Sequence, residues 1–361
     1  IWRAPTDNEA NAWGDQTMAI RWREAGLDRL REQVNAMEVT RINPRVVRVR
    51  VESFVCAPDR TEGFECRYVY TIFGSGDVVL DSQVVPDKSL PPLPRVGVRM
   101  ILPDEYDRFS WYGRGPHESY SDRKMGARIG VYGGSVEDQY VPYIVPQENG
   151  NKTDVRWASL TDADGAGLLI VGLPLLNVSA HHFTAQDLTE ARHTYELKRR
   201  DAITLNLDYT QSGLGNGSCG PGVLPKYLLE SSEYGYRLRL RPLSKGTASP
   251  ATLTKQVLKD GRDREKTLFH RKGAKDAKEN KAYSFDDRYQ TQVKSRFRGT
   301  LFLSVFIREI RVPLFLSRTF LLDCLDFGFC LWLCGLCGGN KKALLYGCAG
   351  GLFFSIRKST D

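Results

Sequence analysis

Apolar and polar residues alternate along much of the first two thirds of the chain. Residues 46–52 read Val-Val-Arg-Val-Arg-Val-Glu, in which charged side chains separate the valines. A period of two places the apolar side chains on one face of a strand, so this pattern predicts half-buried antiparallel strands. Further strand-like segments occur at residues 64–72, 78–85, 96–102, 168–172, 203–209 and 234–240.

One early segment has a helical pattern instead. Four apolar side chains lie near one face of a helix over residues 13–33: Trp13, Ile20, Leu27 and Leu30. Trp22 broadens this face. One helical turn is expected at residues 187–191, with Asp187 as its cap. Many short strands and one early helix predict an all-β fold, an antiparallel sandwich.

Two segments, residues 111–120 and 140–150, are dense in aromatic residues, glycine and proline. Gly113 and Gly115 allow turns, whereas Pro116 fixes the backbone in extended or turn geometry. We expect ordered loops that join strands, and such loops often carry binding residues. Residue types alone leave open that these are sheet crossovers that bind nothing.

The whole chain has a net charge of +8, and all of this net positive charge belongs to its last third. Residues 244–361 hold 22 Lys and Arg against 11 Asp and Glu, which leaves 29 against 32 for residues 1–243. The first part therefore has a net charge of −3 and no basic footprint for nucleic acid, so no nucleic-acid partner is expected.

Residues 244–361 also differ in pattern. Residues 255–298 are charged without amphipathic order, and residues 301–354 are rich in Leu, Phe and Cys. Charged residues interrupt the apolar runs before they reach the roughly 18 residues of a membrane helix, so no membrane partner is expected. We interpret this tail as lying outside the fold, either disordered or translated from non-coding sequence. An added membrane-surface segment is the alternative.

The cysteines and histidines predict neither a disulfide framework nor a metal site. Cysteines in the first part are well separated, which favours a reducing cytoplasm: Cys56, Cys66 and Cys219. In the tail, Cys334 and Cys337 resemble half of a zinc motif, but a second pair is missing. The histidines lack metal-binding spacing: His181, His182 and His193.

Carboxylates in the two aromatic segments are interpreted as loop anchors and not as a catalytic pair. They are Glu118, Asp122, Glu148 and Asp154. We expect Arg114 to pair with Glu118 through charge-assisted hydrogen bonds, and Arg123 to pair with its neighbour Asp122.

Several motifs follow one another along residues 1–243. They are Ile-Trp-Arg-Ala-Pro-Thr-Asp-Asn at residues 1–8, Tyr-Gly-Arg-Gly-Pro-His-Glu at 112–118, Pro-Gln-Glu-Asn-Gly at 146–150, Asp-Val-Arg-Trp at 154–157 and Ser-Cys-Gly-Pro at 218–221. This series resembles the C-terminal domain, or small chain, of the family 2 glycoside hydrolase β-galactosidases. Since the chain begins at Ile1 without a methionine, we expect a fragment or a processed chain.

The resemblance implies an antiparallel β-supersandwich, as in galactose mutarotase-like proteins, over residues 1–243. It also implies hydrolysis of terminal β-D-galactosides such as lactose, with retention of configuration by two carboxylates. In the family these glutamates lie in a (β/α)8 barrel, and nothing in this sequence has the strand–helix alternation of a barrel. The chain alone is therefore expected to be inactive, with no catalytic residue of its own. The family's Mg and Na ions are expected mainly in the missing domains, with no cofactor in this chain.

The resemblance further implies that Gly217, Ser218 and Cys219 border the sugar or aglycone. Other family members carry a tryptophan where this chain has Cys219, and a thiol offers a smaller, softer contact than an indole. A thiol that simply packs at the rim of the sandwich is the alternative. The loop motif of Arg114, Glu118, Glu148 and Asn149 is expected to be structural.

The expected partners are the barrel-containing remainder or large subunit, a galactoside, and further copies in an oligomer, in the cytoplasm. One alternative is an independent carbohydrate-binding or mutarotase-like module. A mutarotase needs a general acid and base facing one cleft, whereas His117 and Glu118 would point apart on an extended backbone. A second alternative is a structural small subunit of a hetero-oligomeric galactosidase.

Overall fold

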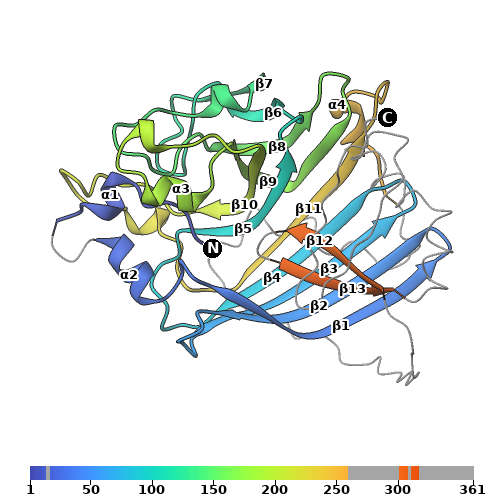
Figure 1. The fold of residues 1–361 in the computed structure, drawn as a ribbon, viewed down its shortest axis with the longest axis horizontal. Coiled ribbons are helices and arrows are strands. Elements are labelled where there is room, and N and C mark those ends of the chain that lie inside the picture. The colour runs from blue at the N-terminus through green and yellow to red at the C-terminus, as the bar shows by residue number, and fades with distance from the viewer. Residues whose placement is uncertain (14–16, 259–300, 308–309, 317–361) are drawn as a thin grey trace, which may run out of the picture.

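The computed structural model describes residues 1–13, 17–258, 301–307 and 310–316, and Figure 1 shows its fold. The described chain contains one large sheet of eleven strands. These strands are β1 (Arg31–Asn43), β2 (Val46–Cys56), β3 (Gly63–Phe73), β4 (Val78–Pro86), β5 (Arg95–Pro103), β6 (Arg108–Gly115), β7 (Arg128–Ser135), β8 (Lys152–Thr161), β9 (Gly167–His181), β10 (Ala202–Gln211) and β11 (Tyr234–Leu243).

The strands pair antiparallel in the order β1-β2-β3-β4-β11-β9-β8-β6-β7, and β10 pairs with both β5 and β9. Figure 1 shows β1 to β4 in one layer and β5 to β10 in another, and β11 joins the two because it pairs with β4 and β9. The prediction of an all-β antiparallel supersandwich is confirmed.

The inner faces of the two layers share one apolar core. Val49 and Val51 of β2, Val98 of β5 and Leu238 of β11 all belong to the same buried cluster. On β2 the intervening Arg50 is exposed, as the alternating sequence predicts. Burying one such aliphatic side chain contributes about 1.5–3 kcal/mol to folding.

The predicted early helix is present but shorter than residues 13–33. It forms α2 (Met18–Glu24), and residues from Arg31 onwards belong to β1 instead. Gly26 follows the C-terminal end of α2. Its φ of +75° favours glycine, and its missing Cβ leaves room for Ala57. The predicted apolar face is only partly buried. Trp13 and Ile20 are exposed, whereas Leu27 and Trp22 are buried, and Trp22 donates to the Pro92 carbonyl.

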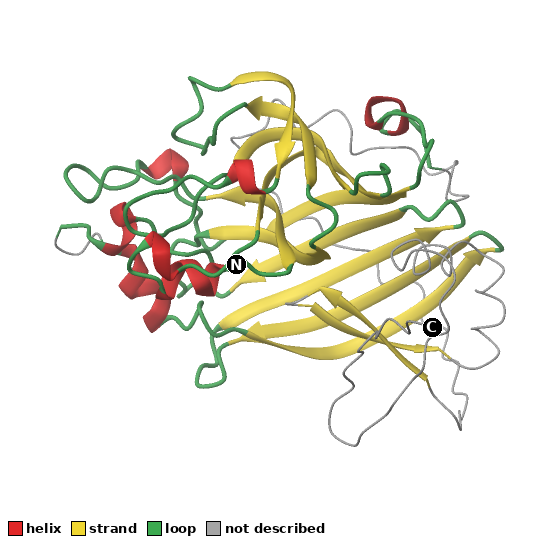
Figure 2. Ribbon diagram, turned by 45° about the horizontal axis from the view of Figure 1, so that its top comes forward, coloured by secondary structure: helices red, strands yellow, loops and turns green. Residues whose placement is uncertain are grey.

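The helices of the described chain are all short. Besides α2 they are α1 (Asp7–Ala10), α3 (Ala185–Glu190) and α4 (Pro250–Leu253). Figure 2 shows that most helical turns gather at one end of the strands, where long loops also meet. In α3 the cap is Thr184 and not Asp187, which is the third helical residue and completes the capping box. No helix of the described residues has the length and apolar character needed to cross a bilayer.

The first predicted aromatic loop is partly strand. Residues 108–115 form β6, an inner strand between β7 and β8, and the loop begins only after Gly115. A Cβ at Gly113 would lie 2.8 Å from a methyl carbon of Val155, so glycine here permits close contact with β8. Residues 140–150 are an irregular loop, as predicted.

The described chain continues beyond residue 243. Leu253 of α4 is buried against Trp157, Leu169, Val171 and Leu243. Farther on, β12 (Leu301–Ile307) and β13 (Ile310–Leu316) pair with each other. The half zinc motif at Cys334 and most of the predicted charged segment lie outside the described residues, and the division of the chain at residue 243 stays a prediction.

Candidate functional site

Arg3 ties the N-terminal segment to the end of β10. Its side chain is fully buried, pairs with Glu9 and donates to Gln211 Oε1 at 3.1 Å. It also donates to the carbonyls of Ser212 at 3.0 Å and Gly213 at 3.3 Å. Because a buried guanidinium requires partners for its charge and its N–H groups, these contacts hold the first residues against the loop after β10.

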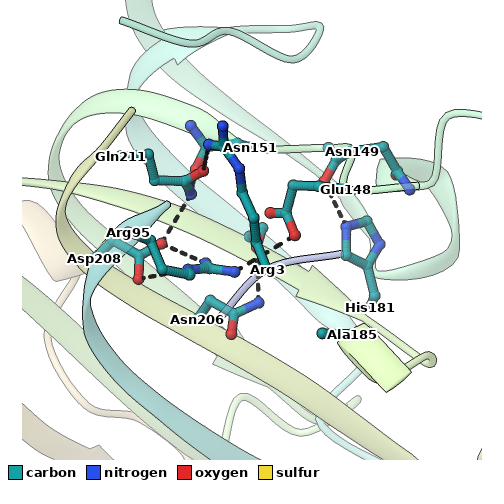
Figure 3. Close-up of polar contacts among 12 residues, drawn as sticks. Arg3, Arg95, Glu148, Asn149, Asn151, His181, Ala185, Asn206, Asp208 and Gln211 are labelled. Atoms are coloured by element: carbon teal, nitrogen blue, oxygen red, sulfur yellow. Dashed lines mark hydrogen bonds and ion pairs between the residues drawn. The ribbon is translucent and has the colours of Figure 1, made fainter. Parts of the chain in front are cut away.

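A second buried arginine joins the sheet to the 140–150 loop (Figure 3). Arg95 of β5 pairs with Asp208 of β10, with Nε 3.0 Å from Oδ1, and with Glu148 at 3.4 Å. Gln211 donates to Asp208 at 2.8 Å and to Asn151 at 3.2 Å. Burial raises the pKa of Glu148, although Arg95 and Arg3 oppose the rise. Glu148 is thus a loop anchor, as its predicted structural role requires.

Asn149 holds the same loop through its side chain and its backbone. Its Oδ1 accepts from Val141 N at 3.0 Å, and its Nδ2 donates to the Gln147 carbonyl at 2.9 Å. Its own carbonyl lies 2.9 Å from His181 Nε2. Burial lowers the pKa of His181 to about 4, so the ring is neutral near pH 7 and donates this hydrogen bond.

Glu118 and Arg114 also anchor loops, but the predicted pairings were wrong. Glu118 pairs with Arg123, accepts from Tyr143 Oη, and accepts from Gly150 N at 2.7 Å. Arg114 instead pairs with Asp154 at 2.5 Å. The reason is that β6 ends at Gly115, so that Arg114 lies beside the start of β8 whereas Glu118 lies on the loop.

Arg123 does not pair with its neighbour Asp122. The Asp122 carboxylate accepts from the amide of Gly215 at 2.8 Å, in the loop that carries the predicted substrate-binding residues. The four carboxylates singled out from the sequence therefore each have a different partner.

The loop after β10 places its three predicted substrate-binding residues differently. Gly217 is buried, and a Cβ there would lie 2.5 Å from the Asn8 carbonyl oxygen. The Ser218 hydroxyl donates to Asn8 Oδ1 at 2.7 Å. Cys219 is an exposed free thiol. Only Cys219 has its side chain open to a ligand, and the other two residues support the loop.

The predicted histidines are not gathered into one site. His182 lies between Asp104 and Asp107, at 3.2 Å and 3.3 Å, and His193 is exposed beside Glu196. Among the described residues, no group of three or more His, Cys, Asp or Glu side chains is placed to hold a metal ion.

Comparison with known proteins connects this geometry to a family. A family model described as "Beta galactosidase small chain" matches residues 1–240. The chain belongs to this family. The curated relatives named β-galactosidase include one from Priestia megaterium, 35% identical over 246 residues, and one from Vibrio cholerae, 36% identical over 248 residues. Each match covers 67% of this chain and 23% of the relative, so the chain spans about a quarter of the length of these relatives.

Solved structures of other proteins are also similar to this small-chain family member. They include a galactose 1-epimerase from Lactobacillus acidophilus, 12% identical, with a TM-score of 0.32, over 60% of this chain and 67% of that one. A galactose mutarotase related enzyme from the same organism is 11% identical, with a TM-score of 0.28, over 58% and 72% of the two chains.

Sequence reasoning missed several residues that hold the N-terminal segment, the 140–150 loop and the loop after β10 in place. Asn8, Arg3, Arg95, Asp208 and Gln211 were not singled out, although the first two lie in the motif at residues 1–8. Arg95 immediately precedes the predicted strand at residues 96–102. A charged residue at the start of an apolar strand is the one local signal that could have marked it.

Proposed function

We propose that the chain supplies one wall of the galactoside site of a β-galactosidase, whose catalytic carboxylates lie in the remainder of the enzyme. The observation that carries this proposal is the exposed Cys219 at the tip of a loop that Asn8 and Asp122 hold from two sides. Family membership supports the activity, because the curated relatives are named β-galactosidases and are about four times longer than the matched region.

The remainder of the enzyme is therefore the principal partner, as the same chain or as a separate large subunit. A terminal β-D-galactoside such as lactose is the proposed substrate, and oligomerisation through this domain is part of the proposal. The Mg and Na ions of the family are proposed to lie mainly in the remainder of the enzyme. The free thiols of Cys56, Cys66 and Cys219 support a cytoplasmic location.

The test measures hydrolysis of o-nitrophenyl β-D-galactoside. The whole chain is assayed alone, mixed with Priestia megaterium β-galactosidase that lacks the matching region, and fused to that fragment. We expect activity in the fusion and none from either part alone. Activity in the mixture as well would favour a separate small subunit. Activity from this chain alone, or an inactive fusion, would contradict the proposal.

Within the active enzyme, Cys219 tests where the sugar binds. We expect Cys219→Trp to lower KM by about two- to tenfold, because an indole adds a flat apolar face against a sugar. Cys219→Ala should raise KM by a smaller factor. If both substitutions leave KM and kcat unchanged, the loop does not border the substrate.

A further inference from the structure

The loop that carries Cys219 is held by a residue of the N-terminal segment. Asn8 Nδ2 donates to the Gly215 carbonyl at 2.7 Å, and Asn8 Oδ1 accepts from the Ser218 hydroxyl at 2.7 Å and from the Ser218 amide at 3.3 Å. One side chain therefore bridges two points of the loop three residues apart. An amide is suited to this bridge because it both donates and accepts.

The backbone leaves little space between Asn8 and the loop. A Cβ at Gly217 would lie 2.5 Å from the Asn8 carbonyl oxygen and 3.0 Å from Ala12 Cβ. Gly217 is thus the residue that lets the loop lie directly on α1. Any larger residue at this position would push the loop away from the N-terminal segment.

Contacts within the N-terminal segment hold Asn8 in place. Glu9, the next residue, is buried and pairs with Arg3, and its other carboxylate oxygen accepts from Thr6 N at 2.9 Å. Arg3 in turn donates to the carbonyls of Ser212 and Gly213 at the base of the same loop. The first nine residues therefore contact the loop at its base through Arg3 and at its tip through Asn8.

We infer that Asn8 is a positioning residue for the galactoside site: it sets the place of Cys219 by bridging Gly215 and Ser218. This inference rests on the proposed function, because it assigns a role in substrate binding to a residue that does not touch the substrate. Asp122 also holds the loop, by accepting from Gly215 N, so that removal of Asn8 loosens the loop while this second anchor remains.

Hydrogen exchange in the whole chain tests the positioning directly. We expect Asn8→Ala to raise amide exchange about tenfold in a peptide covering residues 214–220, since three hydrogen bonds between the Asn8 side chain and the loop are lost. Asn8→Asp keeps the oxygen that accepts from Ser218 and should give an intermediate rate. Asn43→Ala is the matched control, a half-buried asparagine in the β1–β2 turn that accepts from Arg45 N. It should leave exchange in this peptide unchanged.

Kinetics of the active fusion test the consequence. Asn8→Ala should raise KM for the galactoside by about the same factor as Cys219→Ala and change kcat less than about twofold, because Asn8 acts on the sugar through Cys219 and not on the reacting atoms. Asn8→Asp should restore part of the lost affinity, and Asn43→Ala should leave both constants unaltered.

Three results would overturn the inference, and they are distinguishable. Unchanged exchange in Asn8→Ala means that Asn8 does not hold the loop. Faster exchange with unchanged KM, while the Cys219 substitutions do alter KM, means that the loop binds the sugar without needing Asn8. Unchanged KM in the Asn8 and Cys219 variants alike means that the proposed site is wrong and the inference fails with it.

Discussion

Two enclosed side chains, His181 and Glu148, have pKa values that burial shifts in opposite directions. The pKa of His181 falls to about 4, whereas the pKa of Glu148 rises in spite of the nearby Arg95 and Arg3. The neutral imidazole suits its place, because its Nε2 donates to the Asn149 carbonyl within the 140–150 loop. Protonating His181 would add a third positive charge beside Lys152 and Arg95, which together with burial lower the pKa of His181.

We predict that His181 makes the fold sensitive to acid. Its folded pKa of about 4 lies below the value of about 6.5 in the unfolded chain, so unfolded molecules bind more protons in this window. The contribution to stability is complete above pH 6.5 and is lost as the pH falls towards 4, by about 3 kcal/mol at most. Urea unfolding of wild type and His181→Gln at pH 7.5 and 4.5 measures it. Equal losses of stability in the two proteins would contradict the prediction.

At the scale of the elements, the strands show where sequence patterns succeed and where they fail. β2 and β3 were predicted because each has one buried and one solvent-facing side. β8 was not, because polar residues such as Lys152 and Thr153 are buried within it and hide the alternation. β1, at the edge of the sheet, is mostly exposed and has few apolar side chains to set a period.

Some residues of the candidate site could be predicted from the sequence, and others could not. Glu148, Asn149 and Cys219 lie in short motifs that sequence resemblance could identify. Arg3 and Arg95 could not be assigned roles, because their partners lie far away in sequence: Gln211 is 208 residues from Arg3, and Asp208 is 113 residues from Arg95. Such pairs become visible only when the sheet brings β5, β10 and the N-terminal segment together.

The close contact of β6 with β8 yields a prediction for Gly113. Gly113→Ala should destabilise the fold by about 1–3 kcal/mol, because the new Cβ would lie 2.9 Å from the Cα of Val155 and backbone cannot move aside easily. Gly235→Ala in β11 is the matched control, since a Cβ there meets nothing within 4 Å. Thermal unfolding measures both. A Gly113 variant as stable as the Gly235 variant would show that the strands can separate freely.

For the molecule as a whole, the folded unit extends beyond the family match. The match ends at residue 240, yet Arg239 donates to the carbonyls of Leu253 at 3.3 Å and Gln256 at 3.2 Å and pairs with the buried Asp77. Together with the burial of Leu253, these contacts fasten α4 onto the sheet.

We therefore predict that α4 contributes to stability. Leu253→Ala should lower the free energy of unfolding by about 2–3 kcal/mol, as expected for truncating a buried leucine. Val257→Ala, at a position where the side chain is 82% exposed, should change it by less than about 0.5 kcal/mol. Urea denaturation of the two variants compares them. Similar small losses in both would mean that α4 only rests on the surface.

The hydrogen bonds between Arg3 and the residues at the end of β10 also limit when the N-terminal segment can dock during synthesis on the ribosome. Arg3 emerges from the ribosome before Gln211, which follows 208 residues later. At a synthesis rate of about 5–20 residues per second, the wait lasts roughly 10 to 40 s. During that time the contacts of Arg3 with Gln211, Ser212 and Gly213 cannot form. The N-terminal segment and the loop after β10 can therefore be joined only after β10 has been synthesised.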